Sequence, residues 1–242
     1  MEEFQKKMSA TLIDSLENQS MKDFAVKILQ DLPEYWWIGP ASSSGEYHPL
    51  YVCGEHGLFL HSYAVGQFAV WSMGLEQYQN KFSSLERDAI IIVSFTHDGL
   101  KHGEEKGHTV WEHPLLMAER YKSYKGQVDV PDDIIDFMAE TVSSHMGQWN
   151  TNKRNSIVLP KPTTEAQQLV HLFDYFASRK TCELHFEDVA PIKKETIETF
   201  KFTFGKHNGE MLTTVLEKDP SYVEWLKENY HKEPLRTLLT KV

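Results

Sequence analysis

The stretch Ser84-Leu-Glu-Arg-Asp-Ala-Ile-Ile-Ile-Val-Ser-Phe-Thr-His-Asp98 decides the fold, because it joins a long apolar run to two polar side chains. Its opening serine and early acidic residues are typical of a helix N-terminus, and the apolar run predicts a buried helix over 84–97. That helix delivers the His97 imidazole and the Asp98 carboxylate side by side, just before Gly99. Histidine and aspartate together suit a divalent ion such as Mn, Fe, Co, Ni or Zn, so this helix end is a candidate metal site.

Length and composition are those of a folded globular protein. The chain has 242 residues, of which 40% are hydrophobic and 12% aromatic, enough for one good core and a small appendage. No apolar run is long enough to span a bilayer, and the first residues lack the apolar core of a signal peptide. We therefore expect a cytoplasmic protein with no membrane partner. The net charge of −10 argues against non-specific nucleic-acid binding, although a bound dication reverses the local field for a phosphate.

Helical periodicity dominates the chain up to about residue 190. It predicts a mainly α protein whose first domain covers 1–190, with N-terminal helices over 1–32 and a core over 33–182. The stretch 33–56 is rich in proline, glycine and serine, and an irregular loop of that length is typical of a functional segment. The predicted helices of this domain cover 4–16, 21–32, 57–74, 84–97, 109–124, 131–145 and 164–181.

Ligand-type side chains recur at the predicted helices and form one candidate constellation. Helical bundles build metal sites from inward-pointing side chains on facing helices. Each of these residues alone is more typical of an ordinary structural residue, but their joint occurrence indicates a shared site. On the last helix, His171 precedes Asp174 by three residues, so we expect it to support that carboxylate. The members of the constellation are His61, His97, Asp98, His113, His145 and Asp174.

The order and local context of these residues resemble the HD-domain superfamily of metal-dependent phosphohydrolases. The run His97-Asp98-Gly-Leu-Lys101 is similar to the HDxxK signature of the superfamily. The approach from Pro40-Ala-Ser to Gly57-Leu-Phe-Leu-His61 resembles the segment before the first ligand in HD-type 3′→5′ exoribonucleases and relaxase-associated HD domains. The resemblance covers roughly 33–182 and implies an HD-type helical bundle.

This resemblance also implies a ligand set. It places a first divalent ion, one of Mn, Fe, Ni, Co, Zn or Mg, among His61, His97, Asp98 and Asp174. His113 and His145 then hold a second ion or the substrate phosphate. Many relatives carry two consecutive histidines where this chain has His145-Met146. Methionine is a poor ligand for a hard dication, so the number of ions, one or two, stays open.

The resemblance further implies roles in catalysis and substrate binding. Asp98 is a ligand that also steers the attacking water, and Lys101 is a candidate partner for a substrate phosphate. His48 and Arg179 are further candidates for substrate contacts. Each of the last three also has a plain interpretation, as a solvated or supporting side chain.

The composition changes after about residue 190, which predicts a small α+β appendage over 191–242. Phe200-Lys-Phe-Thr-Phe204 alternates like a strand, the next five residues are typical of a turn, and two short helices are expected over 211–218 and 221–231. The Phe-Gly-Lys206 and Tyr-x-x-Trp225-Leu elements resemble the small domain appended to proofreading-type DNA exonucleases. Either Lys206 and exposed aromatics contact nucleic acid, or the unit braces the helical core.

Three functions remain open at this point. The leading hypothesis is a metal-dependent phosphohydrolase acting on phosphoester bonds in nucleic acid or nucleotides, with a preference for a 3′→5′ exonuclease or phosphodiesterase on single-stranded substrate. The strong acidity favours instead a small substrate, and thus a nucleotide phosphatase, a triphosphohydrolase or a cyclic-nucleotide phosphodiesterase. A third hypothesis is an HD module that binds a nucleotide or protein without hydrolysis, against which the full ligand set argues. The sequence identifies no protein partner.

Overall fold

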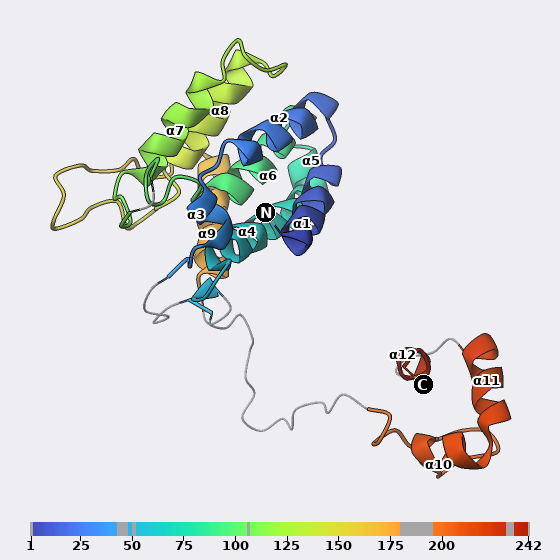
Figure 1. Cartoon of the computed structure of the whole chain (residues 1–242). Coiled ribbons are helices and arrows are strands. Elements are labelled where there is room, and N and C mark those ends of the chain that lie inside the picture. The colour runs from blue at the N-terminus through green and yellow to red at the C-terminus, as the bar shows by residue number, and fades with distance from the viewer. Residues whose placement is uncertain are drawn as a thin grey trace. The chain divides into compact units, whose positions relative to one another are not determined.

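The computed structural model describes residues 2–42, 48–49, 52–105, 107–179, 196–230 and 235–241. Over these residues the protein is mainly α, as predicted. The chain divides into two compact units, Met1–Leu184 and His185–Val242, whose helices are labelled in Figure 1. The predicted domain boundary at 190/191 lies outside the described residues.

The first unit follows the predicted helices closely and adds two short ones. The short additions are α3 and α5, the former inside the stretch that we expected to be irregular throughout. Observed ends differ from predicted ones by a few residues, chiefly at 109–124, where the helix begins only at His113. The helices are α1 (Glu3–Asp14), α2 (Gln19–Gln30), α3 (Glu34–Ile38), α4 (Gly57–Met73), α5 (Glu76–Gln79), α6 (Ser84–Thr96), α7 (His113–Ser123), α8 (Asp132–Ser143) and α9 (Glu165–Ala177).

Helix α6 is the centre of this unit. Its start is fixed by a capping box in which the Glu86 amide donates to the Ser83 hydroxyl and the Ser83 amide donates to the Glu86 carboxylate. Every residue from Asp88 to Thr96 is buried, and α6 contacts α2, α4, α5, α8 and α9. A helix that is apolar almost all round is stable only when it is surrounded. These five helices therefore pack directly against α6.

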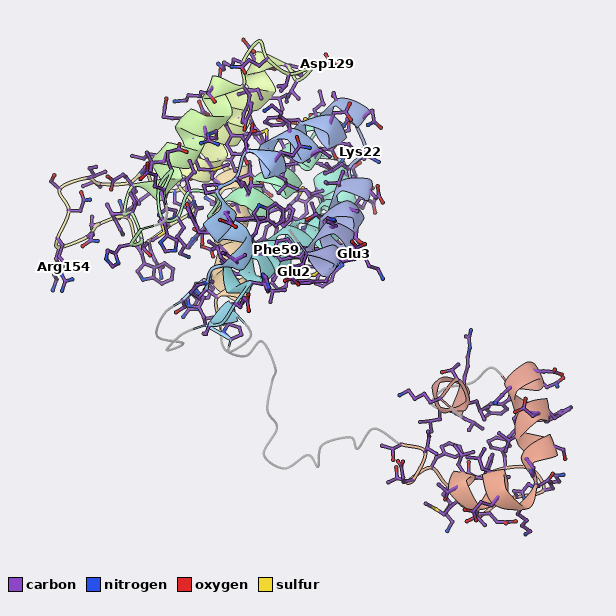
Figure 2. All side chains as sticks on the ribbon, in the orientation of Figure 1. Glu2, Glu3, Lys22, Phe59, Asp129 and Arg154 are labelled. Carbon is purple, nitrogen blue, oxygen red and sulfur yellow. The ribbon has the colours of Figure 1, made fainter. Side chains whose placement is uncertain are left out.

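Aromatic side chains join α6 to α3 and α4. The Trp36 ring centroid lies 5.6 Å from that of Phe59 and 5.5 Å from that of Phe95. Helices α4 and α6 approach closely at Gly66, where a Cβ would lie 3.2 Å from the Phe95 Cβ. Figure 2 labels Phe59 near the start of α4. This packing fixes the end of α6 relative to α4.

Helices α7 and α8 pack against each other, and α8 also contacts α6 and α9. Figure 2 shows Asp129 at the turn between α7 and α8, and Arg154 at the tip of the long loop before α9. Thus α4, α6, α7, α8 and α9 are the elements around which the candidate site residues lie.

The second unit has its own small core. Its helices are α10 (Leu212–Lys218), α11 (Pro220–Asn229) and α12 (Leu235–Leu239), and α12 was not predicted. The expected strand over 200–204 is wrong, since the described residues there form only an isolated bridge between Lys201 and Met211. Because α10 begins directly after Met211, too little chain remains for a ladder. Among the described residues, no helix has the length and apolar character needed to cross a membrane.

A buried carboxylate ties α6 to the turn between α1 and α2. Asp88 is only 1% exposed, and its oxygens accept hydrogen bonds from the backbone amides of Glu17 and Asn18 at 2.8 to 3.1 Å. The Asn18 side-chain amide donates to it as well, at 2.8 Å. Charge-assisted bonds of this kind offset the cost of burying an ionised group.

We predict that Asp88→Ala lowers the free energy of unfolding by about 2 to 4 kcal/mol, because the backbone amides of Glu17 and Asn18 lose their buried acceptor. Urea unfolding followed by circular dichroism measures the change. Asp23→Asn, which alters an exposed aspartate on α2, is the matched control and should change stability by less than about 0.5 kcal/mol. Equal effects of the two substitutions would contradict this role for Asp88.

Candidate metal centre

Three segments bring four ligand-type side chains together at the end of α6. His61 lies on α4, His97 and Asp98 follow directly after α6, and Asp174 lies on α9. The His61 Nε2 lies 3.0 Å from Asp174 Oδ1 and 4.0 Å from Asp98 Oδ2. The His97 Nε2 lies 3.6 Å from each of these two carboxylate oxygens. Ligands bound to one ion at about 2.1 Å lie about 3 to 4 Å apart. The donors of His61, His97 and Asp174 lie close enough together to hold one ion, and Asp98 forms a second such set with His97 and His145.

A second group of donors meets the other oxygen of Asp98. Its Oδ1 lies 3.1 Å from His113 Nε2 and 3.7 Å from His145 Nε2. The two imidazole nitrogens lie 3.2 Å from each other. The Asp98 carboxylate therefore presents Oδ2 to His61 and His97, and Oδ1 to His113 and His145.

Hydrogen bonds to the backbone fix the tautomer of three of these histidines. The Nδ1 of His97, His113 and His145 lies in each case 2.8 Å from the carbonyl oxygen three residues earlier. Since a carbonyl only accepts, each Nδ1 carries a proton, so in the neutral form of each ring the lone pair lies on Nε2, the atom that faces the carboxylates. Histidine ligands of metal ions are oriented in the same way.

Some polar atoms at this site lack a bonding partner, and a bound cation would be that partner. His97 is fully buried, and its Nε2 has no hydrogen-bond partner. The facing Nε2 atoms of His113 and His145 both carry lone pairs, so neither can donate to the other. A buried polar atom without a partner costs about 1 to 3 kcal/mol. Imidazole nitrogens and carboxylate oxygens in this number fit Mn, Fe, Co, Ni or Zn.

Charge at the site favours ionised carboxylates. Burial opposes ionisation, but Lys101 and His97 outweigh it and hold the pKa of Asp98 well below its usual range. His61 and His97 do the same for the pKa of Asp174. Burial likewise opposes the charged form of His97, yet Asp98 and Asp174 raise the pKa of this imidazole. At His145, burial dominates and lowers the pKa, which favours the neutral imidazole that binds metals.

A cavity of about 490 Å³ opens onto these donors. The sequence-predicted residues His48, His61, Asp98, Lys101, His113, His145, Asp174 and Arg179 line it, and His97 lies behind them. The Lys101 Nζ lies 2.6 Å from Asp98 Oδ2. The His48 ring lies 5.8 Å from that of His61, and burial, with the charges of His61 and Lys101, lowers the pKa of His48 to about 4.

His171 does not support Asp174, contrary to our expectation. Its Nδ1 donates to the carbonyl oxygen of His145 at 2.8 Å. This contact requires the turn at Gly147, which has a φ of +60° and where any Cβ would lie within 2.4 Å of the His171 ring. His171 therefore holds in place the backbone that carries His145.

Four further residues line the cavity without having been predicted, and one of them is Trp149, which is 44% exposed. A signal for it existed in the sequence, since an aromatic residue four positions after a candidate ligand and two after a glycine is well placed to border the same site. The others are Thr109, Met146 and Ser178.

Comparison with protein families matches part of the second unit. Residues 202–230, within the second unit, match the family model described as the exodeoxyribonuclease X-like C-terminal domain. This supports the predicted exonuclease-type element at the C-terminus. No curated protein and no solved structure matches the chain.

We predict that Mn²⁺ stabilises the protein through the His97 imidazole. At a hundredfold excess over the dissociation constant, binding adds about 2.7 kcal/mol to the free energy of unfolding. His97→Ala should remove most of the resulting shift in Tm, as measured by differential scanning calorimetry. His108→Ala, at an exposed histidine, is the control and should keep the full shift. An undiminished shift in His97→Ala would contradict this assignment.

We also predict that this stabilisation grows with pH. Because the pKa of His97 is raised above 6.5, a proton competes with the metal ion at low pH, so the Mn²⁺-induced shift in Tm should be larger at pH 8 than at pH 6. Without metal the sign is opposite: the contribution of His97 to stability is complete below about pH 6.5 and is lost as the pH rises through the raised pKa. A Mn²⁺ effect that is larger at pH 6 would contradict the prediction.

Proposed function

We propose that this protein is a metal-dependent phosphohydrolase of the HD type that hydrolyses phosphoester bonds in nucleic acid or nucleotides. The observation that carries the proposal is the Asp98 carboxylate, whose two oxygens face two groups of imidazoles at the wall of one cavity. A cavity of about 490 Å³ is within the size range of small-molecule sites.

The side chains divide the chemical work. A divalent ion held by these ligands would lower the pKa of water and neutralise charge on the phosphoryl group. Asp98 would be a ligand between the two groups of imidazoles, and its carboxylate would accept a hydrogen bond from the attacking water. Lys101 is held by Asp98 at 2.6 Å, and its flexible side chain can move to a phosphate oxygen once a substrate supplies competing negative charge. Arg179 lies farther along the cavity wall, where no carboxylate of the described residues pairs with it.

Within this class we favour a 3′→5′ exonuclease or related phosphodiesterase acting on single-stranded substrate. The support is the match of 202–230 to the exodeoxyribonuclease X-like C-terminal domain. In the same unit, the Lys206 Nζ lies 4.7 Å from the centre of the Tyr222 ring, and Trp225 is exposed beside it. A cation next to aromatic rings is the kind of surface that binds single-stranded nucleic acid.

A nucleotide phosphatase, triphosphohydrolase or cyclic-nucleotide phosphodiesterase is the second candidate. The net charge of −10 favours it, because an acidic protein repels a long polyanion more than a mononucleotide. The two candidates share the same site chemistry and differ only in substrate.

We predict that Asp98→Ala reduces hydrolysis by at least about 10³-fold, which corresponds to about 4 kcal/mol of transition-state stabilisation. The assay incubates the protein with Mn²⁺ and single-stranded oligonucleotides, nucleoside mono- and triphosphates, and cyclic nucleotides. Asp129→Asn, at an exposed turn, should remain fully active, and circular dichroism establishes that both variants are folded.

Cleavage of mononucleotides alone would replace the exonuclease by the second candidate. Full activity of Asp98→Ala, or no cleavage of any substrate by the wild type with Mn²⁺, Fe²⁺, Co²⁺, Ni²⁺, Zn²⁺ or Mg²⁺, would overturn the proposed function.

A further inference from the structure

A flat aromatic surface borders the cavity beside the candidate ligands. Trp149 lines the cavity and is 44% exposed. Its ring is nearly parallel to that of Tyr175, at an angle of 12° and a centroid distance of 5.8 Å. The Arg179 guanidinium lies 4.1 Å from the Tyr175 centroid and 5.8 Å from the Trp149 centroid. Trp149 and Arg179 line the cavity, and Tyr175 packs against both, so that two rings and a cation form one wall.

The turn that carries Trp149 is held in place by hydrogen bonds. The Trp149 amide donates to the Met146 carbonyl at 3.1 Å. The next residue, Asn150, donates from its side chain to the Leu159 carbonyl at 3.0 Å, and the Leu159 amide donates back to the Asn150 carbonyl at 2.9 Å. The wall therefore exists before any ligand binds, which lowers the entropy cost of binding.

The residues of the wall are also close in sequence to candidate metal ligands. Trp149 follows His145 by four residues within one turn, and Tyr175 comes directly after Asp174 on α9. A group lying against the Trp149 ring would consequently be next to a phosphate held at the ligands. In a nucleotide, the sugar links the phosphate to a flat aromatic group, the nucleobase.

The aromatic and cationic side chains of the wall favour a ligand with a nucleobase. A tryptophan left half-exposed gains from covering its face, and the stacking of a base on an aromatic side chain tolerates every base. Arg179, which has no carboxylate partner among the described residues, offers a planar cation that stacks on rings or binds phosphate. A sugar phosphate without a base would leave the Trp149 face uncovered.

We propose that Trp149, supported by Tyr175 and Arg179, is a platform on which the nucleobase next to the scissile phosphate stacks. The substrate class is then a base-bearing phosphoester, and not a sugar phosphate or a simple phosphomonoester. This inference rests on the proposed function for the position of the reacting phosphate.

The test compares two oligonucleotides with Mn²⁺, one normal and one whose terminal nucleotides are abasic. In the wild type, kcat/KM should be higher for the normal strand. Trp149→Ala should reduce this ratio about 5- to 100-fold, mainly through KM of the normal strand, and Trp149→Phe should restore part of it. Trp71→Ala, which removes an exposed tryptophan of α4, should leave the ratio unchanged. If Trp149→Ala keeps the wild-type ratio, the platform is wrong while the proposed function stands.

If the wild type cleaves no phosphoester, the proposed function fails. A binding measurement then tests the stacking platform independently of activity. Isothermal titration with adenosine 5′-monophosphate and ribose 5-phosphate then uses wild-type protein and Trp149→Ala. Preferential binding of the nucleotide that is lost in Trp149→Ala supports the platform. Equal binding of the nucleotide by both proteins, or no preference for it over the sugar phosphate, overturns it.

Discussion

The burial of two carboxylate groups at one site is the constraint on which this structure depends. Asp98 and Asp174 lie among imidazoles, and burial of ionised groups is tolerated only when positive charge or donors compensate it. In the described structure Lys101 and the histidines supply that compensation, and the pKa values of both aspartates are accordingly low. The same balance leaves His97 Nε2 without a partner, so the site is neutralised but not fully satisfied. A cation is the component that would satisfy it.

The helices around α6 place the charged and polar side chains of the site next to one another. A capping box starts α6, and burial on all sides holds it, so that the residues after Thr96 come out at the end of the apolar core. Helices α4 and α9, which both contact α6, add one ligand-type side chain each. Backbone carbonyls then fix the imidazoles, and His171 fixes the backbone at His145. Several polar side chains of the site, among them His61, His97 and His145, are therefore as buried as the apolar core.

Much of this could be predicted from the sequence, and the failures have physical reasons. The apolar run before His97 predicts α6 because a fully buried helix shows its burial in composition alone. Helices α3 and α5 are too short to show a period. The prediction of a strand over 200–204 was wrong because α10 begins directly after Met211 and leaves too little chain for a ladder. His171 was assigned to Asp174 by helical spacing, whereas its partner is brought in by the turn at Gly147, a non-local contact that spacing does not reveal. Trp149 was missed although its position four residues after His145 was a signal for it.

Diffraction from crystals grown with Mn²⁺, recorded at the manganese absorption edge, tests the central claim most directly. We expect an anomalous peak among the side chains of His61, His97, Asp98 and Asp174, at about 2.0 to 2.3 Å from the atoms that bind the ion. A second peak near Asp98 Oδ1 and His113 would make the centre binuclear. An anomalous map with no peak among these four side chains, at a Mn²⁺ concentration that saturates any stabilisation, would contradict the account.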